Sequence, residues 1–112
     1  MPEIKLIWDV QSQPSRAIKC LLEAGGVKHE AVHIKLFNGE GPEIKAKLNP
    51  GGGIPFILWD GEPVNESASI LRFLARACPE LNQFYPADNH ALCAKIDQAL
   101  DWNGTTFRKT DA

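Results

Sequence analysis

The chain of 112 residues lacks most of the features that mark membrane, secreted and nucleic-acid-binding proteins. No apolar run approaches the roughly 20 residues that a membrane-spanning helix needs. The pattern of a secretory signal, a charged start followed by a long apolar stretch, is not visible either. Lys and Arg number 12 against 14 Asp and Glu, so the formal net charge is −2 and no basic excess points to nucleic acid. We therefore expect neither a membrane nor a nucleic acid as partner.

Cysteine is scarce, with Cys20, Cys78 and Cys93 at wide spacings and no C-x-x-C pair. The odd number and the spacing argue against a disulfide framework and against a thiol–disulfide redox motif. We expect three partly buried thiols in a reducing, cytoplasmic setting. The histidines are not paired with cysteines at zinc-ligand spacing, so no metal site is predicted, and His29 and His33 are expected at the surface.

Apolar residues make up 44% of the chain, which is enough for a core, and turn residues divide it into short elements of alternating type. The patterns predict these elements in order: a strand over Ile4–Trp8, a helix capped by Ser15 and ended by Gly25-Gly26, a strand over Glu30–Phe37, a weak helix over Glu43–Leu48, a strand over Phe56–Trp59, an Asp60-Gly61 hairpin into a strand around Pro63-Val64, and a helix from Ser67 to about Ala77. The first two strands are joined by one helix, so they should be parallel. This order predicts an α/β, thioredoxin-like fold with a mixed four-stranded sheet.

The remaining third of the chain changes character. Residues 79–89 are rich in turn and breaker residues and are predicted to be a linker after a first domain over 1–78. From His90 onward Leu92, Ile96 and Leu100 recur every four residues, which predicts an amphipathic helix. One helix cannot bury a core of its own, so residues 90–112 are interpreted as the truncated start of an all-helical domain.

The most informative stretch is 51–58, Gly-Gly-Gly-Ile-Pro-Phe-Ile-Leu, together with Glu66-Ser67. Pro55 cannot donate a sheet hydrogen bond and is the kind of residue that adopts a cis bond in a tight turn, which would leave the backbone of Ile54 free for an outside partner. The helix that opens near Ser67 presents unpaired N–H groups and a partial positive charge, which attract a carboxylate. The stretch predicts a docking edge for a small peptide-like ligand that carries a carboxylate and an amine.

A set of motifs in family order resembles the cytosolic glutathione transferases and is most similar to the theta class. The motifs are Ser12-Gln13-Pro14-Ser15-Arg16-Ala17, Asn49-Pro50, Ile54-Pro55, the run from Asn65 to Leu71, Tyr85-Pro86, and Trp102 with Thr105-Thr106-Phe107-Arg108. Each motif is weak alone, and the ordered set is specific. The resemblance implies an N-terminal domain that binds glutathione as co-substrate with no other cofactor, a helical domain that supplies most of the electrophile pocket, and a homodimer.

The resemblance also implies roles for single residues. Ser12 matches the serine whose hydroxyl stabilises the glutathione thiolate, and Ile54 and Pro55 match the residue that pairs with the cysteinyl unit and the cis proline. Glu66 matches the partner of the γ-glutamyl ammonium and Ser67 that of its carboxylate. From the residues alone, Ser12 is equally well a loop serine with a local turn bond, and Glu66-Ser67 an ordinary helix cap.

Four further positions border the expected site. Gln13 lies near the expected thiol position, and Arg108 matches a basic residue near the active site of the theta class but is equally well a solvated arginine. Gly53 stands where theta enzymes often carry a lysine for the glycyl carboxylate, and Glu40 brings an acid where that class has a polar or basic contact. The resemblance therefore predicts a weakened glycyl end of the glutathione site.

The expected function is that of a theta-like glutathione transferase, which conjugates glutathione to small electrophiles, with weak binding and poor turnover in a chain of this length. The alternative is a non-catalytic binding or assembly module of the same fold. A glutaredoxin-like reductase is disfavoured because it needs a cysteine near position 12, and Cys20 falls about two turns into the predicted helix.

Overall fold

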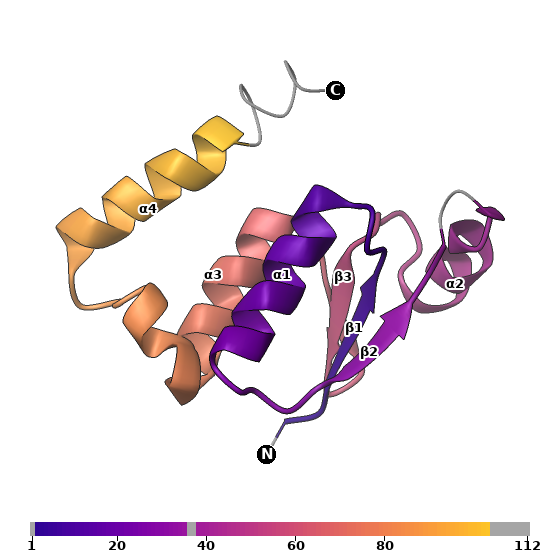
Figure 1. Cartoon of the computed structure of the whole chain (residues 1–112), viewed down its shortest axis with the longest axis horizontal. Helices are drawn as coiled ribbons and strands as arrows, with labels where there is room; N and C mark the ends of the chain where they lie inside the picture. The colour runs from indigo at the N-terminus through magenta and orange to yellow at the C-terminus, as the bar shows by residue number, and fades with distance from the viewer. Residues whose placement is uncertain (1, 36–37, 104–112) are drawn as a thin grey trace.

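The computed structural model describes residues 2–35 and 38–103, which form a four-stranded sheet with helices on both faces (Figure 1). The elements are β1 (Ile4–Trp8), α1 (Gln13–Ala24), β2 (Glu30–His33), α2 (Gly41–Leu48), β3 (Phe56–Trp59), β4 (Glu62–Val64), α3 (Ser67–Ala77), the 3-10 helix η2 (Pro79–Phe84) and α4 (His90–Trp102). None of the described helices is both long enough and apolar enough to span a membrane.

The sheet has the strand order β2-β1-β3-β4 and is mixed. β1 pairs with β2 in parallel, and it pairs with β3 in the antiparallel sense from Ile4–Trp59 to Ile7–Phe56. β3 and β4 form the hairpin that the sequence predicts: Asp60 and Gly61 both have positive φ, 48° and 88°, as a two-residue hairpin turn requires. The predicted thioredoxin-like α/β fold is therefore confirmed.

Side chains alternate across the central strands and build a core on each face of the sheet. Ile4, Leu6 and Ile57 lie among the buried residues of α1 and α3, while Ile7 and Phe56 belong to a second cluster against which α2 packs. Figure 1 shows the same layers, with α1 and α3 on one side of the sheet and α2 on the other. The period-two pattern of strand side chains accounts for this division.

Three predicted boundaries are wrong. α2 begins at Gly41 rather than Glu43, because Pro42 is accommodated in its first turn. The cap of α1 is Ser12 rather than Ser15, because the helix begins at Gln13 and accommodates Pro14 in its first turn. β2 ends at His33 rather than Phe37: Ile34 N–H still donates to Trp8 O at 2.7 Å, but a turn then starts. Residue 37 itself lies outside the described part of the chain.

The segment predicted as a linker contributes to the core. η2 buries Leu81 completely, and Tyr85 after it is 3% exposed. The predicted apolar stripe of α4 is shifted, because Leu92 is exposed whereas Cys93 is buried and Ile96 packs against the core. Burial in this part of the chain follows tertiary contacts that a local pattern does not reveal.

Two surface assignments also change. The side chain of His29 is only 7% exposed, since its Nδ1 lies 2.7 Å from Val27 O and its Nε2 lies 2.9 Å from Lys19 Nζ. The prediction for His29 is therefore wrong, whereas the His33 side chain is 36% exposed, in agreement with its prediction. Among the thiols, Cys20 is exposed rather than partly buried.

Candidate functional site

The turn between β1 and α1 presents Ser12 at the helix N-terminus. Its Oγ accepts a hydrogen bond from Ser15 N–H at 3.4 Å, and its own N–H donates to Asp9 O at 2.9 Å. This is the local bond that the residues alone allowed. A hydroxyl that only accepts keeps its O–H proton for another acceptor, so capping and thiolate stabilisation are compatible at Ser12.

The same turn is held by side chains from outside it. Ser15 is fully buried, and its Oγ accepts from Asp9 N–H at 3.2 Å. Arg16 donates to Val10 O at 3.0 Å, which is a structural contact. His33, at the end of β2, accepts from Val10 N–H at 3.2 Å, and sequence reasoning missed this contact because nothing local links positions 23 residues apart. Gln13, the first residue of α1, is exposed beside Ser12.

The Ile54-Pro55 peptide bond is cis, as the sequence predicts. The β1–β3 ladder ends at the Ile7–Phe56 pair, so Ile54 lies beyond it. Within the described part of the chain, the backbone N–H and C=O of Ile54 make no hydrogen bond. Ile54 is half-buried while Pro55 is buried, and the result is an open backbone edge on a fixed turn.

At the start of α3, Glu66 occupies the cap position with φ of +71°. A non-glycine residue rarely adopts this conformation, and such residues cluster at functional sites. The exposed Glu66 side chain makes no capping bond to the helix. The N-terminus of α3, which starts at Ser67, therefore has no capping bond from the side chain of Glu66, which leaves its N–H groups available to an anion.

An amide bridge connects the Ile54 turn with the start of α3. Asn49, which is 2% exposed, donates through Nδ2 to Asn65 Oδ1 at 2.6 Å, and its backbone O accepts from Gly52 N–H at 3.1 Å. A Cβ atom on Gly52 would collide with both amide side chains. Sequence reasoning used Asn49 only as a helix stop, because no local pattern pairs it with Asn65.

The far end of the expected site has few contacts. Gly53 is exposed, and a Cβ atom placed on it would have no neighbour within 4 Å. The Glu40 carboxylate accepts from Lys35 N–H at 3.0 Å, so the acid is occupied within its own loop. Arg108 lies outside the described residues.

Ser12, Ile54 and Glu66 lie at one end of the sheet, because Ser12 and Glu66 follow the last residues of β1 and β4, and Ile54 precedes the first residue of β3. A cavity of ≈ 170 Å³ borders the Ser12 turn, and it is lined by Asp9, Val10, Gln11, His33, Lys35 and Asn38. No group of three or more potential metal ligands occurs in residues 2–35 and 38–103.

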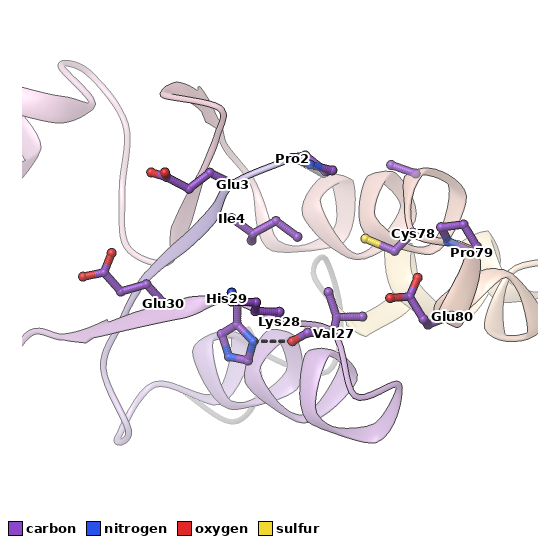
Figure 2. A pocket seen from close by; sticks show the side chains of 11 residues that line it. Pro2, Glu3, Ile4, Val27, Lys28, His29, Glu30, Cys78, Pro79 and Glu80 are labelled. Carbon is purple, nitrogen blue, oxygen red and sulfur yellow. Dashed lines mark hydrogen bonds between the residues drawn. The ribbon is translucent and has the colours of Figure 1, made fainter.

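A second cavity, of ≈ 580 Å³, opens at the opposite end of the sheet, where β1 and β2 begin (Figure 2). Its walls include Ile4, Val27, His29 and Cys78, and none of the predicted site residues lines it. Burial, with a smaller effect of the Glu80 charge, raises the pKa of the Cys78 thiol. Because the thiolate is the reactive form of cysteine, Cys78 is suited to packing rather than to thiol chemistry.

Comparisons with known proteins identify the family of the chain. Residues 12–77 match the family described as glutathione S-transferase, N-terminal domain. The chain is 34% identical to glutathione S-transferase theta-1 of Bos taurus over 108 residues, covering 95% of this chain and 44% of that protein. It is 32% identical to glutathione S-transferase T1 of Arabidopsis thaliana, covering 97% of this chain and 45% of that protein. The chain thus spans about half the length of these relatives.

Solved structures of the theta class share the fold. Human glutathione-S-transferase T1-1, apo form, superimposes with a TM-score of 0.82 at 28% identity, over 94% of this chain and 44% of that one. The theta class enzyme of Xanthomonas axonopodis pv. citri, with glutathione bound, gives 0.78 at 28% identity, over 97% and 52%. The resemblance predicted from the sequence is confirmed, and the chain belongs to the glutathione S-transferase family, with theta-class members among its relatives.

Proposed function

We propose that the chain binds glutathione across the edge formed by Ser12, Ile54 and Glu66. The observation that carries the proposal is the open backbone of Ile54 between two donor sites, the Ser12 hydroxyl and the uncapped start of α3. An extended tripeptide that pairs with Ile54 places its thiol toward one donor and its γ-glutamyl end toward the other.

The γ-glutamyl end is proposed to lie at α3. The Glu66 carboxylate pairs with the ligand's ammonium, and the hydroxyl and N–H of Ser67 bind its carboxylate at the positive end of the helix. The absence of a capping bond from Glu66 favours this role over an ordinary cap. Pro55 fixes the turn, and Gly53 leaves the glycyl carboxylate without a cation from that position.

The chemistry proposed is conjugation of glutathione to small electrophiles. The Ser12 O–H donates a hydrogen bond to the glutathione sulfur and favours the thiolate, which attacks the electrophile and displaces its leaving group. Ser12 stabilises the anion and forms no covalent bond. The family also leads us to propose a cytoplasmic homodimer, which sizing in solution with and without glutathione will test.

The test is conjugation of a small aryl or alkyl halide by wild type and by the Ser12→Ala variant, with Ser69→Ala as a control on the exposed side of α3. We expect Ser12→Ala to lower kcat/KM about 10²- to 10³-fold, as removal of one anion-stabilising donor does in other enzymes. Ser69→Ala should match wild type. Equal rates for wild type and Ser12→Ala would refute the role of Ser12.

A second function, a non-catalytic binding or assembly module, is favoured by the open space at Gly53, a residue without a side chain that could hold the ligand's glycyl end. Titration calorimetry separates the two functions. Heat of binding at millimolar glutathione supports the transferase, whereas its absence supports the module.

A further inference from the structure

The turn that carries Ser12 is fixed at Val10 by side chains from two other elements. Val10 N–H donates to His33 Nε2 at 3.2 Å, and Val10 O accepts from Arg16 Nη1 at 3.0 Å. Val10 is 46% exposed, so apolar packing does little to hold it. Val10, two residues before Ser12, is therefore held in the turn by these two polar contacts.

His33 is itself held in place. Its ring lies against Trp8 with the centroids 5.4 Å apart, and its Nε2 is 3.7 Å from Asp9 Oδ1. The Asp9 carboxylate also accepts from Gln11 N–H at 3.0 Å, so it belongs to the same turn. Trp8, on β1 beside His33, fixes the ring on one side.

The charged groups around the ring come from three directions. Asp9 faces the ring from the turn. Lys35, two residues after His33, lines the cavity of ≈ 170 Å³ that His33 and Asp9 also line. Arg16 reaches Val10 from α1, and Lys19, also on α1, lies 5.9 Å above the Trp8 ring. The Asp9 carboxylate pairs with Nε2, whereas Arg16 and Lys19 contact two neighbours of the ring, Val10 and Trp8.

The contact with Val10 requires a neutral imidazole. Nε2 accepts a hydrogen bond only while it carries no proton, so the ring proton is on Nδ1. Protonation converts Nε2 into a donor that faces Asp9 Oδ1, and Val10 N–H loses its acceptor. The same event changes the partners of two residues in the turn, Asp9 and Val10.

We propose that His33 is a positioning residue for Ser12. Its unprotonated Nε2 holds Val10, and through Val10 it sets the direction of the Ser12 hydroxyl toward the glutathione sulfur. The inference rests on the proposed role of Ser12. It predicts that loss of the acceptor at position 33 weakens thiolate stabilisation at Ser12.

The experiment compares His33→Leu, which has no acceptor, with His33→Gln, whose amide oxygen accepts but does not titrate. His90→Gln, at the exposed start of α4, is the matched control. Without any ligand, exchange of the Val10 amide hydrogen should be about threefold to tenfold faster in His33→Leu and within about twofold of wild type in His33→Gln and His90→Gln.

With saturating glutathione, the thiolate fraction measured by ultraviolet absorbance should fall about threefold to tenfold in His33→Leu and be restored in His33→Gln. An unchanged exchange rate of the Val10 amide in His33→Leu would overturn the proposal. So would a thiolate fraction that stays the same in His33→Leu although the Val10 amide exchanges faster. Failure of the proposed function gives a different pattern. Ser12→Ala would then leave the thiolate fraction unchanged while Val10 still responds to His33→Leu, which overturns the link to catalysis and retains the contact.

Discussion

Two adjacent glycines of the ligand-edge loop have opposite surroundings. A Cβ atom on Gly52 would collide with the amides of Asn49 and Asn65, whereas one on Gly53 would meet nothing within 4 Å. Neither glycine has a positive φ, so conformational freedom does not explain them. Gly52 is required because the Asn49–Asn65 bridge occupies the space of a side chain.

We expect Gly52→Ala to lower the free energy of unfolding by about 1–3 kcal/mol, the usual cost of overpacking a filled site. The same substitution at Gly53 should stay within about 0.5 kcal/mol of wild type, as at other open surface positions. Urea denaturation of the two variants gives both values. Equal unfolding free energies would contradict the steric role of Gly52.

The positive φ of Glu66 links stability to ligand binding at a single position. Glu66→Gly should stabilise the chain by about 1 kcal/mol or less, because glycine adopts this conformation without strain but gains entropy when unfolded. It should also abolish measurable glutathione binding. Glu66→Gln keeps the strained backbone conformation and loses the charge. It should therefore bind glutathione as poorly as Glu66→Gly does, while its free energy of unfolding stays at the wild-type value. Urea denaturation and calorimetry test both statements, and tight binding by Glu66→Gln would contradict the ammonium contact.

At the scale of elements, α4 is fastened to α3 through Tyr85 and Asp97. The Tyr85 hydroxyl lies 2.9 and 3.1 Å from the two carboxylate oxygens of Asp97, and Arg72 on α3 lies 3.4 Å from the first of them. The Arg76 guanidinium stacks 5.0 Å from the Tyr85 ring centroid. Tyr85 thus connects the end of η2, α3 and α4 through one hydroxyl.

Replacing Tyr85 by Phe should loosen α4 selectively. Amide exchange within α4 is expected to rise about threefold to tenfold, the usual effect of one lost hydrogen bond, while β1 and β3 exchange as in wild type. Phe84→Leu is the matched control, because Phe84 is exposed in the same segment. A uniform increase over the whole sheet would show that the contact does not act on α4 alone.

The same residue predicts a pH dependence. Burial is the main cause that raises the pKa of Tyr85, and the hydrogen bond and charge of Asp97 raise it further. The folded state therefore disfavours the tyrosinate, so this stabilisation is complete below the ordinary tyrosine pKa of about 10 and is lost as the pH rises through the higher folded pKa. Thermal denaturation of wild type should show this alkaline loss, and Tyr85→Phe should lack it. Tyr85 is the only tyrosine, so tyrosinate absorbance follows it directly.

The elements that sequence predicts well are those with local signals. The Asp60-Gly61 turn, β3 and the start of α3 follow from turn chemistry and an apolar run. η2 and the buried face of α4 do not, since Leu81 and Cys93 are buried by segments far away in the chain. The site divides in the same way: the cis Ile54-Pro55 bond is a local expectation, whereas the contacts of Asn49 and His33 join residues 16 and 23 positions apart.

For the whole molecule, glutathione should act as a stabilising ligand of the folded chain. Binding to the folded state alone adds RT ln(1 + [L]/Kd), about 1.4 kcal/mol at ten times Kd. Cysteinylglycine, which lacks the γ-glutamyl group, should produce no comparable increase in the melting temperature at the same concentration. Equal shifts with both ligands would show that the start of α3 does not take part in binding.

The strand order also has a consequence for the time course of folding. β1 finds its partner β2 after one helix, but its pairing with β3 joins Ile4 to Trp59, across half of the chain. Long-range closures of this kind cost more chain entropy and form late. Ile54 meets the Ser12 turn only through that pairing, so we expect the ability to bind glutathione to appear in the last refolding phase, after most of the helical signal has returned.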